Sequence, residues 1–254
     1  MNKIIDALVR DYNNHVDDVN YQIASYILHH MSSIKEHTLL EFSKNAYVSK
    51  SSALKYMKEL GYDHFKTFII DFNEEYEKTN HYFDVIRKEI IYRNIPEYFD
   101  TQNIITQQQL MEIKKILKNI KRVFILGDYR AIGCLYEFQI LLLFKGIDAI
   151  IINIDDQKKT VDCMISLRED DLLFIVSPLE SIEAVIDTYR YHEINHLNEI
   201  MNKAVQKIYI GQKSGIPCNF NKCIYIELPF SLNYYSFLYN IIELFNMFSI
   251  SLLK

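Results

Sequence analysis

The sequence from Thr106 onward contains five short, strongly apolar runs that alternate with longer segments of helical pattern. The runs are Val123–Leu126, Ala149–Asn153, Leu172–Val176, Lys207–Ile210 and Ile224–Glu227. Runs of this length that are apolar on both faces and are bounded by helices are typical of parallel strands covered on both sides. The sequence therefore predicts an α/β three-layer sandwich with a parallel five-stranded sheet over 106–254.

The N-terminal part of the chain shows only helical patterns. Ile23, Ala24 and Ile27 form one apolar stripe of a helix over 17–30. Thr38, followed three residues later by Glu41, predicts a capping box at the start of a second helix. This pattern predicts an all-α domain, separate from the sandwich.

A third helix follows the second after a connection of only a few residues, 45–48. Ser49 is the predicted N-cap of this helix, which carries apolar positions including Ala53 and Met57 and ends at Gly61. Two short helices with a tight connection form a helix-turn-helix pattern. We therefore predict a two-domain chain, with a helix-turn-helix domain over 1–77, a linker over 78–105 and the sandwich over 106–254.

The polar face of the third helix concentrates positive charge in a chain whose net charge is −5. A recognition helix needs short or basic side chains in its N-terminal half, where base edges and phosphates are reached. The lysines are expected on phosphates and the serines near base edges, while Tyr56 packs the helix onto its domain. The alternative is a solvated helix face that happens to carry lysines. The predicted DNA contacts are Thr38, Ser49, Lys50, Ser51, Ser52, Lys55 and Lys58.

The stretch Val48–Tyr62, together with Phe65–Phe68, resembles the RpiR family of bacterial transcriptional regulators. In the family's pattern Ser52 stands for a threonine, Lys55 for an arginine and Tyr56 for a phenylalanine, whereas His64 departs from the usual glycine. The resemblance implies a DNA-binding regulator of sugar or amino-sugar metabolism genes. It also implies a C-terminal sugar isomerase (SIS) domain.

The run Arg122–Gly127 looks like the first strand of an SIS domain, leading into a glycine turn. The family holds a phosphosugar with two loops, and both loops are altered here. Tyr129 and Ala131 replace a glycine and a serine in the first loop, and Glu180 replaces a glycine in the second. The domain is therefore expected either to sense a phosphosugar or related anion or to serve dimerisation only. The expected effector-binding residues are Gly127, Tyr129, Arg130, Ala131, Ser177, Leu179 and Ser181.

We expect that the protein is not an enzyme. Isomerisation requires a positioned acid or base beside an intact sugar pocket, and the sequence offers no strong candidate for either. The alternative is a sugar-phosphate isomerase-like enzyme or sensor without DNA binding. His192–His196 satisfies the H-E-x-x-H pattern of zinc proteases, but the further ligands of that class are absent at the expected offsets, so an ordinary pair of surface histidines is favoured. No metal and no cofactor is expected.

The remaining features favour a cytoplasmic homo-oligomer whose partner is a double-stranded DNA operator. Met1–Arg10 has no signal-peptide pattern, and the four cysteines, which have no CxxC spacing, are expected to be reduced. The apolar segment Ser231–Leu253 is expected as a buried or interface helix rather than a membrane span, because Glu243 and several asparagines interrupt it. We expect a homodimer or homotetramer that places two helix-turn-helix units on successive major grooves.

Overall fold

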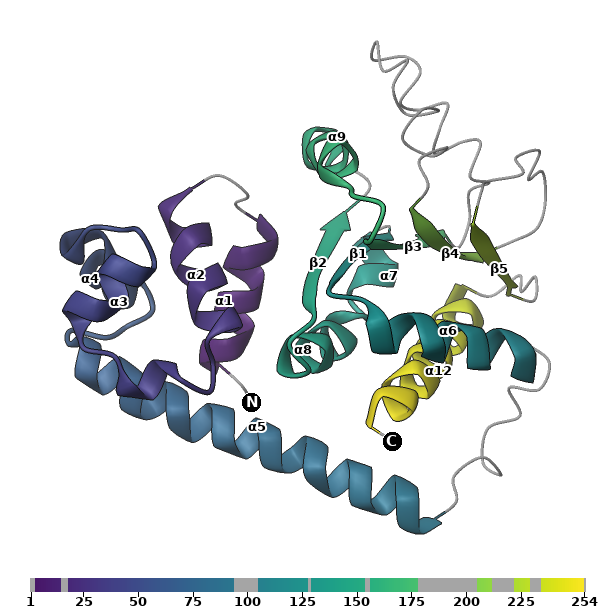
Figure 1. Cartoon of the computed structure of the whole chain (residues 1–254), viewed down its shortest axis with the longest axis horizontal. Coiled ribbons are helices and arrows are strands. Elements are labelled where there is room, and N and C mark those ends of the chain that lie inside the picture. The colour runs from purple at the N-terminus through teal and green to yellow at the C-terminus, as the bar shows by residue number, and fades with distance from the viewer. Residues whose placement is uncertain are drawn as a thin grey trace. The chain divides into compact units, whose positions relative to one another are not determined.

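The computed structural model describes residues 3–14, 18–93, 105–127, 129–153, 156–177, 205–211, 222–228 and 234–253 (Figure 1). The chain divides into two compact units, an N-terminal unit Met1–Glu89 and a C-terminal unit Ile90–Lys254.

The described part of the N-terminal unit is helical. α1 packs against α2, and α4 contacts both α2 and α3. α2, α3 and α4 begin close to the residues that the sequence predicted, because a side chain caps the start of each of these helices. The elements are α1 (Lys3–Asn14), α2 (Val19–His29), the short 3-10 helix η1 (Ile34–Glu36), α3 (Leu39–Asn45), α4 (Lys50–Glu59) and α5 (Phe65–Arg93).

Both predicted caps are confirmed. Thr38 and Glu41 form a capping box at the start of α3, in which each side chain accepts a hydrogen bond from the other residue's backbone amide. Ser49 Oγ accepts a hydrogen bond from the Ser52 amide, at 3.0 Å, at the start of α4. The boundaries of α3 and α4 are therefore set by short-range hydrogen bonds that are readable in the sequence.

The helix α5 extends beyond the predicted end of the helical domain. The predicted boundary of this domain is Glu77, whereas α5 is continuous to Arg93 and the first unit reaches Glu89. Thr79 and Phe83 are buried. The run of acidic residues over Asp71–Glu77 does not end the helix, because carboxylates are compatible with a helix interior. Glu74 also pairs with Lys78 one turn later.

The C-terminal unit contains the predicted parallel five-stranded sheet. Its strand order is β2-β1-β3-β4-β5, and every neighbouring pair is parallel. All five predicted strands are confirmed to within one residue at each end. The strands are β1 (Arg122–Gly127), β2 (Asp148–Asn153), β3 (Leu172–Ser177), β4 (Gln206–Gly211) and β5 (Cys223–Glu227).

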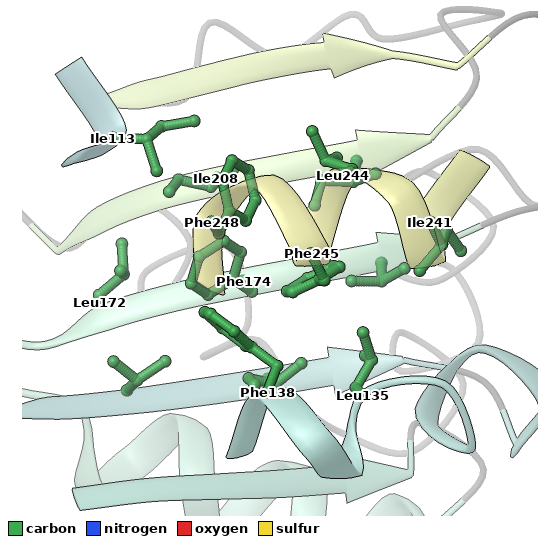
Figure 2. Close-up of a cluster of buried hydrophobic side chains, with 14 of the residues drawn as sticks. Ile113, Leu135, Phe138, Leu172, Phe174, Ile208, Ile241, Leu244, Phe245 and Phe248 are labelled. Carbon is green, nitrogen blue, oxygen red and sulfur yellow. The ribbon is translucent and has the colours of Figure 1, made fainter. Parts of the chain in front are cut away.

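Helices cover the sheet and close its core. An aromatic cluster joins α8 and α12 to the centre of the sheet, where Phe138, Phe174, Phe245 and Phe248 meet (Figure 2). Ile113 of α6 belongs to the same buried cluster, and α9 packs against β2. The helices are α6 (Gln107–Asn119), α7 (Tyr129–Ile132), α8 (Tyr136–Phe144), α9 (Gln157–Ser166) and α12 (Tyr234–Leu253).

One face of the terminal helix α12 is buried, in keeping with the prediction of a buried or interface helix. Ile241, Leu244, Phe245 and Phe248 are at most 2% exposed. Among the described residues, no helix has the length and apolar character that crossing a membrane requires. These four residues belong to the hydrophobic core of their own unit, whereas Ile242 is 40% exposed.

A partly buried ion pair joins β1 to the residue before β3 at the N-terminal ends of these strands. The guanidinium of Arg122 donates to both carboxylate oxygens of Asp171, with Nε to Oδ1 at 2.8 Å, and also to the Ser166 carbonyl. The Arg168 amide donates to Asp171 Oδ2 at 2.7 Å. The hydrogen bonds to Asp171 raise the pKa of Arg122. This end of the sheet is therefore held by polar side chains, and the carboxyl ends of the strands lie at the opposite edge.

Candidate functional site

The helix α4 is fixed to the N-terminal unit by one face. Ala53, Tyr56 and Met57 are buried, which confirms the predicted packing role of Tyr56. The Tyr56 hydroxyl donates to Asp11 Oδ2 of α1 at 2.9 Å. Burial and the neighbouring Asp11 carboxylate both raise the pKa of Tyr56. This anchoring orients the opposite face of α4 outward.

The outward face of α4 presents the three predicted lysines. Lys50, Lys55 and Lys58 are all exposed, and the side chain of Lys55 is 81% accessible. Lys55 Nζ lies 3.9 Å from Glu59 Oε1, which makes a long and solvated pair one turn apart. Glu59 also accepts a hydrogen bond from Asn20 Nδ2 at 3.1 Å, so its carboxylate is shared with α2. The lysine charges remain available to an external anion.

The predicted serines gather at the N-terminus of α4. Ser49 Oγ lies 2.8 Å from both Ser51 Oγ and Ser52 Oγ, in addition to capping the Ser52 amide. The two hydroxyl contacts use two of the three hydroxyl protons, so one proton and several lone pairs remain for an outside group. Short hydroxyl side chains at a helix N-terminus fit close approach to either a base edge or a phosphate.

Thr38 is more committed than the sequence suggested. Its hydroxyl donates to Glu41 Oε2 at 2.8 Å, and its amide donates to the same oxygen at 2.8 Å. These backbone and side-chain hydrogen bonds lower the pKa of Glu41. A carboxylate therefore occupies the N-terminus of α3, which leaves Thr38 less suited to a phosphate than the α4 residues are.

A groove of about 1100 Å³ lies within the N-terminal unit, between α2, η1, α3 and the turn that leads into α4. Histidine and tyrosine side chains line much of it, and Tyr26 stacks on His30 with ring centroids 4.2 Å apart. Glu36 and Glu41 add carboxylates to the lining. Its edge nearest α4 is formed by Lys44, Asn45, Ala46 and Tyr47.

Sequence reasoning missed Tyr47, which lies in the turn between α3 and α4. Its φ is 57°, in the left-handed region, and the residue is 93% exposed. The Tyr47 amide donates to the Lys44 carbonyl and the Val48 amide donates to the Ser43 carbonyl, which is a Schellman ending of α3. The available signal was the shortness of the connection, because so tight a turn needs one left-handed residue and contains no glycine.

The strand ends that precede the two predicted effector loops lie next to each other at the carboxyl edge of the sheet. Gly127 at the end of β1 pairs with Val176, which precedes Ser177 at the end of β3. The strand order 2-1-3-4-5 reverses direction between β1 and β3, and parallel sheets bind ligands at such a switch point. Tyr129 and Arg130 begin α7, directly after this edge. Leu179, Ser181 and Glu180 lie outside the described residues.

Two positions of the first loop serve packing. A Cβ on Gly127 would lie 3.2 Å from Ile132 Cγ2 and 3.4 Å from the Val176 carbonyl oxygen, so the absent side chain allows close contact of β1, β3 and α7. Ala131 is fully buried in the hydrophobic core. Its methyl group therefore offers no polar contact and no exposed surface to a ligand.

Burial affects the thiols of two of the described cysteines. Cys163 and Cys223 are free thiols, and burial raises the pKa of each. Within the ranges that the structure describes, no group of three or more His, Cys, Asp or Glu side chains is arranged to hold a metal ion. The His192–His196 segment and Cys218 lie outside those ranges.

No protein-family model and no curated protein matches the chain. Solved structures with similar folds include the NanR protein of Vibrio vulnificus complexed with ManNAc-6P, at 16% identity and a TM-score of 0.45, covering 98% of this chain and 91% of that one. The sugar isomerase domain of the RpiR transcription factor from Sphaerobacter thermophilus is 13% identical, with a TM-score of 0.44 and coverage of 64% and 87%. The protein MJ1247 of Methanococcus jannaschii is 17% identical, with a TM-score of 0.42 and coverage of 70% and 89%. TM-scores this low do not carry a function over to this chain, whose own geometry is therefore the basis for its proposed function.

Proposed function

We propose that the chain is a DNA-binding transcriptional regulator in which α3 and α4 form the helix-turn-helix and α4 enters the major groove. The observation that carries the proposal is the division of α4 into two faces. Ala53, Tyr56 and Met57 fix one face, and the other presents serines at its N-terminus and exposed lysines along its length. This is the distribution that a recognition helix requires.

The positive charge on α4 is local, which favours a specific role over general solubility. The chain as a whole is acidic, with a net charge of −5. The described residues of α4 carry Lys50, Lys55 and Lys58 against Glu59 alone. Phosphate contacts from these lysines would supply the salt-dependent part of binding, and the Ser49–Ser52 hydroxyls would read base edges or bind phosphates.

We further propose that the C-terminal unit is a sensory or dimerisation domain of the SIS type. Its parallel sheet places the ends of β1 and β3 side by side at a switch point, where a phosphosugar or related anion would bind. We propose sensing or dimerisation, rather than catalysis, for this unit. Self-association through this unit would place two α4 helices on one pseudo-palindromic operator.

Fluorescence anisotropy with the DNA upstream of the protein's own gene tests the proposed function. The wild type should bind this duplex more tightly than a scrambled duplex, with an affinity that falls steeply between about 50 and 200 mM salt. The Lys50→Ala/Lys55→Ala/Lys58→Ala variant should lose most of this binding. A matched variant, Lys115→Ala/Lys118→Ala/Lys121→Ala, removes the same charge from α6 and its end, and it should bind as the wild type does.

Two outcomes would contradict the DNA-binding proposal. In one, the wild type shows no preference for any candidate operator and no salt dependence. In the other, both triple variants lose affinity equally, which would assign the effect to net charge rather than to α4. Thermal shifts across a panel of hexose and amino-sugar phosphates then separate a sensor from a domain that only dimerises.

A further inference from the structure

Tyr47 combines a costly backbone conformation with an almost fully exposed aromatic side chain. Its φ of 57° lies in the left-handed region, where a Cβ approaches the following carbonyl oxygen. The end of α4 makes the same type of turn with Gly61, at a φ of 92°. Glycine adopts this conformation without strain. The chain therefore places a bulky tyrosine where folding alone favours glycine.

Among the described residues, no contact of the Tyr47 side chain offsets this cost. Tyr47 is 93% exposed, and within the described ranges its side chain has no hydrogen bond, ion pair or ring contact. An exposed aromatic residue held in a strained position is a feature of binding sites, because both costs are offset only when a partner is bound.

The position of Tyr47 indicates the partner. Tyr47 precedes Ser49, the N-cap of α4, by two residues, so its side chain leaves the backbone at the end of α4 that carries Lys50 and Ser51. Lys44 and Asn45 lie beside it on the edge of the groove. Tyrosine, lysine and asparagine all donate hydrogen bonds to phosphate oxygens. Glu36 and Glu41 line other parts of the groove, so an anion is favoured at this edge rather than throughout the groove.

We propose that Tyr47 is a positioning residue for duplex DNA, with its hydroxyl donating to a phosphate oxygen and its ring packing against the adjacent deoxyribose. This inference rests on the proposed function, since it requires α4 to lie in the major groove. The contact is with the backbone, so it strengthens binding to every sequence. Tyr47 is uncharged, and its contact therefore releases no counterion and leaves the salt dependence unchanged.

The experiment compares Tyr47→Gly and Tyr47→Phe with the wild type, using the full chain and a mixed-sequence duplex of about 30 base pairs, which spans two half-sites. Tyr47→Gly should weaken binding about tenfold or more, because it removes a hydrogen bond to a charged group together with the ring contact, and it should leave the slope of log affinity against log salt unchanged. The same variant should unfold at an equal or higher temperature, because glycine relieves the left-handed strain. Tyr47→Phe keeps the ring and should bind with intermediate affinity.

Tyr82→Phe is the matched control, because Tyr82 is an exposed tyrosine about 25 Å further along α5 from its start at Phe65. This variant should bind as the wild type does. Wild-type affinity in Tyr47→Gly, in an experiment where the α4 triple-lysine variant loses binding, would overturn the inference and leave the proposed function intact. Failure of the wild type to bind any duplex would overturn both. A lower unfolding temperature in Tyr47→Gly would overturn the strain argument on which the inference depends.

Discussion

The hydrogen bond between Tyr56 and Asp11 holds the proposed DNA-reading helix on its domain, and Tyr56→Phe removes this bond without leaving a cavity. Tyr56 is 1% exposed and donates to Asp11 Oδ2 at 2.9 Å. A hydrogen bond to a charged group contributes about 1.5–3 kcal/mol. The Asp11 side chain keeps 15% exposure and its contact with Arg10, so water solvates part of the carboxylate that the variant leaves behind. We therefore expect a loss of about 2 kcal/mol in the free energy of unfolding of the N-terminal unit.

The pH dependence gives this prediction a second, independent readout. The pKa of Tyr56 is raised above its ordinary value of 10.0, first by burial and then by Asp11. Above pH 10 the unfolded chain loses this proton while the folded chain keeps it, so the wild type loses stability with rising pH, by up to about 1.4 kcal/mol per pH unit. Tyr56→Phe lacks this loss. The difference in stability between the two proteins should narrow above pH 10.

Hydrogen exchange read out by mass spectrometry suits this test, because peptides from α1 and α4 report on the N-terminal unit alone. At neutral pH these peptides should exchange faster in Tyr56→Phe, and peptides from β1 and β3 should not change. Asp11→Asn combined with Tyr56→Phe completes a double-mutant cycle, with an expected coupling of about 1–2 kcal/mol. A coupling near zero, or a stability difference that stays constant from pH 8 to pH 11, would refute the reasoning.

Three further substitutions have expected outcomes. Asp171→Ala leaves the Arg122 guanidinium without its carboxylate partner, at a site where Asp171 is 2% exposed. This variant should lower the free energy of unfolding in urea by about 3–5 kcal/mol. An unfolding midpoint equal to that of the wild type would contradict the structural role of the pair. Thr38→Ala should lower stability by about 1 kcal/mol at neutral pH. Because Thr38 lowers the pKa of Glu41, the difference in Tm between this variant and the wild type should shrink as the pH falls below 4.5, and a pH-independent difference would argue against the capping box. Gly127→Ala places a methyl group 3.2 Å from Ile132 Cγ2 and should cost about 1–3 kcal/mol in thermal unfolding, while an unchanged Tm would mean that α7 shifts freely.

The strands and helix starts were predictable because each depends on a few neighbouring residues. The runs over 123–126 and 172–176 are apolar on both faces, and only a strand in a covered parallel sheet buries both faces at that length. Thr38 and Ser49 cap their helices through bonds that span three residues. The end of the helical domain was not predictable in the same way, since burial of Phe83 depends on tertiary contacts that no local pattern encodes.

The candidate site was likewise predictable only where it depends on neighbouring residues in the sequence. The serines and lysines of α4 follow from helical periodicity, so their exposure was expected. The adjacency of the carboxyl ends of β1 and β3 depends on strand order, which a list of strands does not contain. The burial of Ala131 likewise depends on how α7 packs against the sheet, so its place among the expected ligand-binding residues did not reveal that its side chain faces the core.

The C-terminal ends of α3 and α4 have the same backbone geometry but different residues in the left-handed position. The endings of α3 and α4 use the same pair of hydrogen bonds, from Tyr47 and Val48 in one case and from Gly61 and Tyr62 in the other. The backbone requirement is therefore the same at Tyr47 and Gly61, and folding would be served by glycine at both. Gly61 lies at the C-terminal end of α4, whereas Tyr47 lies at the end where a recognition helix meets DNA. In the proposed function, the tyrosine at one of these two equivalent turns is accounted for by the DNA backbone that it would contact, since folding alone favours glycine there.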